Sequence, residues 1–157
     1  MADDTYTVER SAVIDAPAEH VYAELVDFHR WPAWSPWEDL DPAMQRSYAG
    51  AAHGPGAVYA WSGNRKAGEG SMRITHVVEP RRLDIALLFE KPFKAHNEIR
   101  FELTPEGGGT LVTWTMTGRR TFALKVMSLV RSMDSMVGRD FEKGLARLKA
   151  VVEALEA

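Results

Sequence analysis

The chain has 157 residues, of which 45% are hydrophobic and 26% are charged, and 19 basic against 22 acidic side chains give a net charge of −3. This length suits one domain with a substantial core, and the near-neutral balance gives no reason to expect a nucleic-acid binder. Because the chain has no cysteine, disulfides, thiolate nucleophiles and cysteine-bound metals are excluded.

The N-terminal stretch MADDTYTVER is acidic and polar. It lacks the basic and then apolar order of a signal peptide. No apolar run of the sequence approaches the length of a membrane span. We therefore expect a cytoplasmic protein with one domain over residues 1–157 and no stable membrane insertion.

The first part of the chain predicts one strand and two short helices. Thr5 to Ile14 is rich in β-branched residues and partly alternates, which indicates a strand. Pro17 suits the first turn of a helix, and helical apolar spacing continues from Ala18 to Val26. Phe28 to Trp34 predicts a second short helix, which ends near Pro36.

From residue 44 onward the pattern changes to short strands separated by turn residues. Glycine, asparagine and proline punctuate this stretch at regular intervals, as in an antiparallel meander. The predicted strands are Met44–Tyr48, Ala57–Ser62, Gly70–Val78, Leu83–Phe89, Ala95–Thr104 and Thr110–Gly118.

The last 35 residues before the terminal alanine, Phe122 to Glu156, contain no proline, and apolar residues recur there near the 3.6-residue period. This pattern predicts one long amphipathic helix. Gly138 and Gly144 fall inside it, although each glycine costs about 1 kcal/mol relative to alanine. We expect them to permit a bend or a close approach of the helix to its neighbours.

The order of elements predicts an α+β fold, with one strand, two short helices, about six more strands and one long helix. A strongly curved antiparallel sheet cannot bury its concave face alone, and the last helix is the only element long enough to cover it. The pattern leaves open whether the space between sheet and helix is a packed core or a cavity.

Alternation along the strands predicts which side chains point toward the long helix. This set is aromatic and rich in methionine, whose thioether adapts to varied apolar ligands. Tyr59, His76 and Asn97 are polar members that would orient a ligand in an apolar pocket, or else are satisfied polar groups of a packed core. The candidate ligand-binding residues are Trp34, Trp37, Tyr59, Trp61, Met72, Ile74, Leu87, Phe89, Asn97, Ile99, Phe101, Trp114, Met116, Val130, Met133 and Val137.

Three of the five tryptophans fall within the seven residues WPAWSPW. Trp31, Trp34 and Trp37 are three residues apart, so they can share one side of a helical turn. We expect one or two of these rings to close the mouth of a pocket and one to pack in the core. Three purely structural rings are the alternative.

Three parts of the sequence together resemble one group of proteins. They are TYTVERSAVIDAPAEHVYAELVDFHRWPAWSPWE, the strands with GAVYAWSG and GEGSMRI, and the final MVGRDFEKGLARLK. The group is the polyketide cyclase/dehydrase-like branch of the START/SRPBCC (helix-grip, birch-allergen-like) superfamily. This resemblance implies a curved antiparallel sheet of about seven strands around a long C-terminal helix. It also implies two short helices after the first strand and an internal hydrophobic cavity for a lipid, polyketide or aromatic molecule.

The sequence contains no recognisable catalytic or metal-binding motif. Its five histidines lack paired zinc-ligand spacing, and phosphate loops and dinucleotide fingerprints are absent, so we expect no metal and no cofactor. Glu38, Asp39 and Glu69 are candidate acid/base groups if apolar neighbours raise their pKa, and solvated charges otherwise. The basic stretch from Arg119 to Arg131 would guide an anionic ligand head or form a solvated face.

Three functions follow from these observations. A carrier or sensor for a hydrophobic small molecule needs only an apolar cavity. A cyclase or dehydratase needs, in addition, an inward acid/base group with a shifted pKa. A partner-binding module, as in co-chaperone relatives of this fold, needs exposed indoles between Trp31 and Trp37 and a filled interior.

Overall fold

The computed structural model describes residues 5–38, 40–65, 67–91, 94–119 and 130–156. At residues 119, 130–134 and 136 it describes the backbone but not the side chain. The elements are β1 (Thr5–Ile14), α1 (Ala18–Leu25), the 3₁₀ helix η1 (Phe28–Ala33), β2 (Gln45–Gly50), β3 (Ala57–Ser62), β4 (Glu69–Val78), β5 (Arg82–Lys91), β6 (Ala95–Glu106), β7 (Gly109–Arg119) and α3 (Val130–Glu156). The predicted order of strands and helices is confirmed. The predicted helix residues 122–129 lie outside the described residues.

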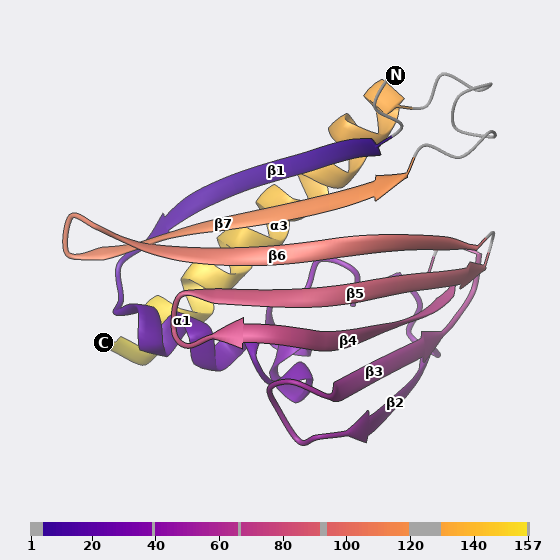
Figure 1. The fold of residues 1–157 in the computed structure, drawn as a ribbon, viewed down its shortest axis with the longest axis horizontal. Coiled ribbons are helices and arrows are strands. Elements are labelled where there is room, and N and C mark those ends of the chain that lie inside the picture. Colours follow the sequence, from indigo (N-terminus) through magenta and orange to yellow (C-terminus); the bar gives the residue numbers. More distant parts are fainter. Residues whose placement is uncertain (1–4, 39, 66, 92–93, 120–129, 157) are drawn as a thin grey trace.

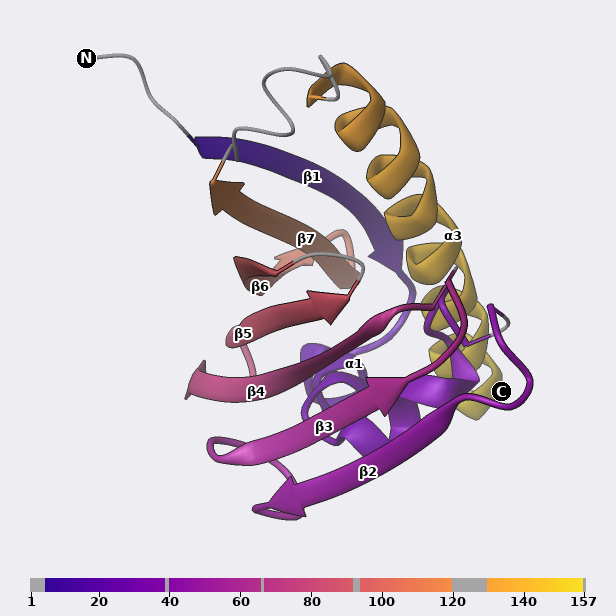
Figure 2. The same cartoon turned by 90° about the vertical axis from the view of Figure 1, so that its right-hand side faces the viewer.

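The strands form one seven-stranded antiparallel sheet in the order β1-β7-β6-β5-β4-β3-β2 (Figure 1). The meander from β2 to β7 follows the chain, and β1 completes the sheet by pairing with β7 over its whole length. The sheet is strongly curved (Figure 2). The long helix α3 runs across the mouth of this curve, and α1 and η1 lie on the concave side. This arrangement confirms the predicted helix-grip fold class.

Strict alternation separates the two faces of the sheet. On β6, Asn97, Ile99, Phe101 and Leu103 are buried, and the residues between them are exposed. Because successive side chains of a strand point to opposite faces, this pattern places one apolar set against the helices. The convex face carries the ion pairs of Asp84 with Arg82 and Arg100.

One inward assignment from the sequence is wrong, because β4 contains an irregularity. Ile74 pairs with Ile85, but His76 pairs with Asp84, so Thr75 is an extra residue in the ladder. A bulge of this kind shifts the alternation of the residues that follow it. His76 is therefore exposed on the outer face and cannot orient a ligand inside.

Both glycines of α3 mark places where the helix approaches the rest of the molecule closely. A Cβ at Gly138 would lie 2.1 Å from the guanidinium of Arg10, which is hydrogen-bonded to Glu142. A Cβ at Gly144 would lie 2.9 Å from the ring of Trp114 and from Pro36. We expected these glycines to permit either a bend or a close approach of the helix, and the structure shows the close approach.

Candidate functional site

An aromatic core fills the middle of the concave face. Trp31 and Trp34 are buried in it, with ring centroids 4.5 Å apart. Their indole N–H groups donate to backbone carbonyls at the end of α1, from Trp31 to Leu25 at 2.9 Å and from Trp34 to Glu24 at 3.4 Å. The aromatic core consists of Phe28, Trp31, Trp34, Phe101, Trp114 and Phe141.

Trp37 is only partly buried and links the loop after η1 to α3. Its Nε1 donates to Asp140 Oδ2 at 3.1 Å, and its ring stands edge-on to Trp114 and Phe141. Two of the three clustered tryptophans are therefore core residues. Trp31 and Trp34 offer no exposed indole patch for a partner protein.

A row of residues crosses the concave face next to the aromatic core. Each is the Cα partner of the next across six neighbouring strands, from β1 through β7, β6, β5 and β4 to β3. We call it the concave row, and in spatial order it consists of Tyr6, Gly118, Asn97, Leu87, Met72 and Tyr59. Apolar side chains thus lie between a buried amide on one side and a tyrosine on the other.

The concave row is packed less completely than the aromatic core. Its residues other than Gly118 are 3 to 9% exposed, whereas the residues of the aromatic core are 0 to 3% exposed. Beyond the row, Trp61 and Phe89 are only partly buried, with ring centroids 5.8 Å apart. The accessible apolar surface of the concave face is therefore concentrated at this end.

A buried hydrogen bond joins the two sides of Gly118. The Tyr6 hydroxyl donates to Asn97 Oδ1 at 2.9 Å, across 91 residues of sequence. Burial raises the pKa of the Tyr6 hydroxyl, so it stays protonated and can donate. The bond occupies Oδ1, and no described residue accepts from the Asn97 amide NH₂.

Gly118 makes this hydrogen bond sterically possible. A Cβ there would lie 2.0 Å from Asn97 Oδ1 and 2.7 Å from the Tyr6 hydroxyl. Real Cβ atoms do not approach other atoms so closely, so any larger residue would displace one of the two partners. The space that glycine leaves is thus filled by the polar pair.

A second polar group lies at the opposite end of the row. Arg46 on β2 is ion-paired with Glu38, and its charge acts on the Tyr59 hydroxyl. Burial and the negative charge of Glu38 raise the pKa of Tyr59 to about 12, against the opposing effect of Arg46. Tyr59 is therefore a neutral hydroxyl group at physiological pH.

We expect Tyr59 to titrate near pH 12 rather than near pH 10. A raised pKa stabilises the fold fully below the unfolded value of about 10, and this contribution is lost as the pH rises toward the folded value. Ultraviolet titration of the wild type and of Tyr59→Phe would isolate this transition as their difference. A difference curve centred near pH 10 would contradict the assignment.

Several of the sequence candidates lie together and others do not. Tyr59, Trp61, Met72, Leu87, Phe89, Asn97 and Met116 share the accessible end of the concave face, whereas Trp34, Ile74, Ile99, Phe101 and Trp114 are closed off behind it. Val137 packs against the core from α3. Val130 and Met133 belong to α3, but their side chains are outside the described set.

The candidate acid/base groups are not gathered on the concave face. Glu38 is held by Arg46, and Glu69 accepts a hydrogen bond from the Ser62 hydroxyl at 3.2 Å. Asp39 and most of the basic stretch from Arg119 to Arg131 fall outside the described residues. Within the described part of the chain, no three potential metal ligands come together.

Tyr6, Gly118 and Arg46 are site residues that the sequence candidates omit. Tyr6 has a detectable signal, because it shares the parity of Val8 and Ile14, whose apolar side chains mark the inner face of β1. Gly118 has no such signal, since its role depends on two side chains that come from other strands.

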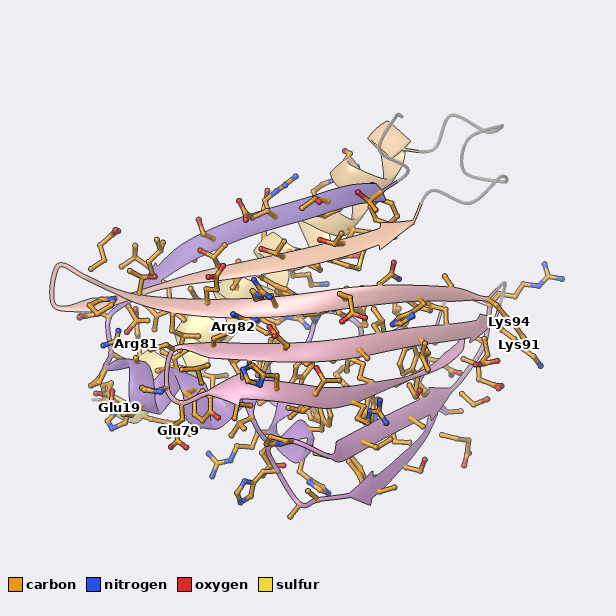
Figure 3. All side chains as sticks on the ribbon, in the orientation of Figure 1. Glu19, Glu79, Arg81, Arg82, Lys91 and Lys94 are labelled. Atoms are coloured by element: carbon orange, nitrogen blue, oxygen red, sulfur yellow. The ribbon has the colours of Figure 1, made fainter. Side chains whose placement is uncertain are left out.

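The outer surface has an open groove of about 390 Å³ at the turn between β4 and β5. Arg81 and Arg82 lie at its edge, while Lys91 and Lys94 lie at the far end of the same sheet (Figure 3). The groove has a mixed lining of Val78, Arg81, Arg82, Glu102, Leu103, Thr104 and Pro105. It is separate from the concave row.

No described helix is both long and apolar enough to cross a membrane.

Known structures share this fold at low sequence identity. Protein CV1439 from Chromobacterium violaceum has a TM-score of 0.68 and 17% identity, over 94% of this chain and 96% of that one. Ara h 8.0201 has a TM-score of 0.68 and 16% identity, over 96% and 99% of the two chains. DynU16, a protein of the dynemicin biosynthetic locus, has a TM-score of 0.65 and 18% identity, over 97% of this chain and 48% of that one.

Sequence comparison identifies the family. No curated protein matches this chain. The sequence model of one family, described as polyketide cyclase / dehydrase and lipid transport, matches residues 5–153. The chain therefore belongs to the polyketide cyclase / dehydrase and lipid transport family of the START/SRPBCC superfamily.

Proposed function

We propose that this protein binds a hydrophobic small molecule, of lipid, polyketide or aromatic type, against the concave row and acts as its carrier or sensor. The observation that carries the proposal is accessible apolar surface beside a buried polar pair. Leu87 and Met72 supply the apolar surface between Asn97 and Tyr59. A mostly apolar site with a few placed polar groups is typical of small-molecule pockets.

The proposed lining is narrower than the set of sequence candidates. Trp34, Phe101 and Trp114 have no accessible surface, so they shape the site from behind without touching a ligand in this conformation. We assign direct contact to residues of the accessible end and add Tyr6 to them. The proposed contact residues are Tyr6, Tyr59, Trp61, Met72, Leu87, Phe89, Asn97 and Met116.

Apolar contact can supply most of the binding free energy. Burying about 300 Å² of apolar ligand surface contributes roughly 7 kcal/mol, before the entropy cost of association is subtracted. One hydrogen bond adds about 1 kcal/mol. The larger share of the affinity therefore needs no charged group in the site.

The geometry favours binding over acid/base catalysis. Of the described side chains that β4, β5, β6 and β7 turn inward, none is a carboxylate or a histidine. The inward polar groups are neutral tyrosines and an amide, which donate hydrogen bonds but do not remove protons at neutral pH. Cyclase or dehydratase activity is the alternative that the family description keeps open.

Native mass spectrometry of the protein purified from cells tests the proposal. We expect an apolar adduct of defined stoichiometry, and saturable binding of the neutral fluorescent dye N-phenyl-1-naphthylamine. A protein with no adduct and no binding of this dye would contradict it.

Leu87 and Leu88 give a matched pair of variants, because these neighbours on β5 point to opposite faces of the sheet and Leu88 is exposed. We expect Leu87→Gln to weaken binding of N-phenyl-1-naphthylamine by roughly five- to tenfold through lost apolar contact. Leu88→Gln should leave it unchanged. Circular dichroism of both variants checks that the fold is retained. Equal effects of the two changes would place the dye elsewhere.

A further inference from the structure

We infer that Tyr6 and Asn97 form a recognition site for a neutral oxygen acceptor, such as a ketone, an ester or a phenol oxygen, on the apolar ligand. This inference rests on the proposed function and names the class of ligand. Asn97 is the donor to the ligand, and Tyr6 is the residue that positions it.

The hydrogen bond fixes the direction of the amide. Asn97 Oδ1 accepts from the Tyr6 hydroxyl at 2.9 Å, so the NH₂ group is the part of the amide left to donate. Asn97 is only 3% exposed, and no described residue accepts from its NH₂. The described side-chain atom that is fully buried without a partner is Trp114 Nε1, so the Asn97 NH₂ group keeps accessible surface. A ligand that covers this group must supply an acceptor, or the donor is left costly and unpaired.

The surroundings of Asn97 select a neutral acceptor over an anion. Its Cα partners across the sheet are Leu87 and Gly118, and Ile99 and Met116 follow on the same face. The inward side chains from Leu83 to Phe89, from Ala95 to Leu103 and from Val112 to Gly118 are all uncharged. A carboxylate buried among them would lose its hydration without a cation to replace it.

The row also suggests the extent of the ligand. From Asn97, Leu87 and Met72 lead to Tyr59 across three strand intervals, or roughly 14 Å at the usual spacing between strands. A molecule held by an oxygen at Asn97 would place its apolar body over Leu87 and Met72. This arrangement fits an elongated ring system or chain with an oxygen near one end.

Three naphthalenes of the same shape test this inference by calorimetry. 2-Acetylnaphthalene carries a neutral acceptor, 2-ethylnaphthalene carries none, and 2-naphthoate carries a negative charge. We expect Asn97→Leu to weaken binding of 2-acetylnaphthalene by about fivefold, the value of one hydrogen bond. Its affinity for 2-ethylnaphthalene should change by less than about twofold. Wild-type protein should bind 2-naphthoate more weakly than either neutral probe.

Tyr6→Phe separates positioning from packing, because it removes only the hydroxyl group that fixes the amide. We expect it to weaken binding of the ketone several-fold and to leave 2-ethylnaphthalene unaffected, even if Asn97→Leu fails to fold. Thr117→Val, on the outer face beside Gly118, is the matched control and should affect neither probe.

The outcomes distinguish this inference from the function on which it rests. If 2-ethylnaphthalene binds and the variants weaken both probes equally, or neither, the acceptor site is wrong and the apolar site stands. Tightest binding of 2-naphthoate would show that a cation, not the amide, recognises the ligand. Wild-type protein that binds none of the three probes would remove both the proposed function and this inference.

Discussion

Replacing Trp114 with alanine is expected to lower the free energy of unfolding by about 3–5 kcal/mol, the range for large aromatic residues removed from a core. Trp114 is completely buried, and its ring lies 4.0 Å from that of Phe141 in a stack, measured between centroids. The rings of Phe101 and Trp34 lie 4.9 and 5.6 Å away. Alanine would leave a cavity among these rings.

The surroundings of Trp114 limit how far such a cavity can collapse. Gly144 brings the backbone of α3 against the ring, and strands β6 and β7 hold the opposite side. Urea unfolding followed by circular dichroism measures the loss, which should exceed that of Trp61→Ala, because Trp61 is only partly buried. A loss of less than about 1 kcal/mol would mean that neighbouring rings refill the space, contrary to the close packing described here.

The expected loss of stability makes Trp114→Ala a poor test of ligand contact. Trp114 was a natural ligand-binding candidate from its alternation with Val112 and Met116. Because it has no accessible surface, weaker ligand retention in Trp114→Ala would report on unfolding rather than on contact. Variants at the accessible end, such as Leu87→Gln, avoid this confusion.

The fold was largely predictable, because the alternation of the strands and the 3.6-residue period of the long helix are both clear in the sequence. Alternation of apolar residues gave the strand over Thr5–Ile14 and that over Ala57–Ser62 with the bounds that the structure shows. The order of elements then left few ways to cover the concave face. Strand ends were less predictable, as at β6, which continues through Pro105 to Glu106 beyond the predicted end at Thr104.

The candidate site was less predictable because it depends on register. His76 was assigned inward by alternation, but the extra residue Thr75 reverses the parity after Ile74. The concave row is likewise set by strand pairing, and residues such as Tyr6 and Asn97 become neighbours only through β7 between them. Spacing along the sequence does not contain this information.

The positions of the clustered tryptophans were also only partly predictable from their spacing in the sequence. The three-residue spacing predicted a shared side, and a 3₁₀ helix does bring residues three apart into line. Trp31 and Trp34 pack together for this reason, with their N–H groups on the carbonyls of Leu25 and Glu24. Trp37 follows the end of η1 and instead bonds to Asp140 on α3, an element far away in the sequence.

Replacing Gly118 with alanine is expected to break the hydrogen bond between Tyr6 and Asn97 and to lower the free energy of unfolding by about 1–3 kcal/mol, the cost of a buried polar group left without its partner. The backbone of Gly118 lies outside the left-handed region, so alanine adds no strain of its own. The effect comes from a Cβ placed 2.0 Å from Asn97 Oδ1 and 2.7 Å from the Tyr6 hydroxyl. Loss of the pair should also lower the affinity for 2-acetylnaphthalene.

A double-mutant cycle with Asn97→Ala tests this explanation directly. Asn97→Ala removes the nearer of the two oxygens that the new Cβ would meet and releases the Tyr6 hydroxyl from its hydrogen bond. Gly118→Ala should therefore cost less than half as much in that background. Residues in contact show such non-additivity, whereas independent sites add. Thr117→Ala is the matched control on the outer face and should cost the same with and without Asn97. Equal costs of Gly118→Ala in both backgrounds would mean that the glycine is needed for a reason other than the polar pair, and the positioning of the Asn97 amide would then have no structural basis.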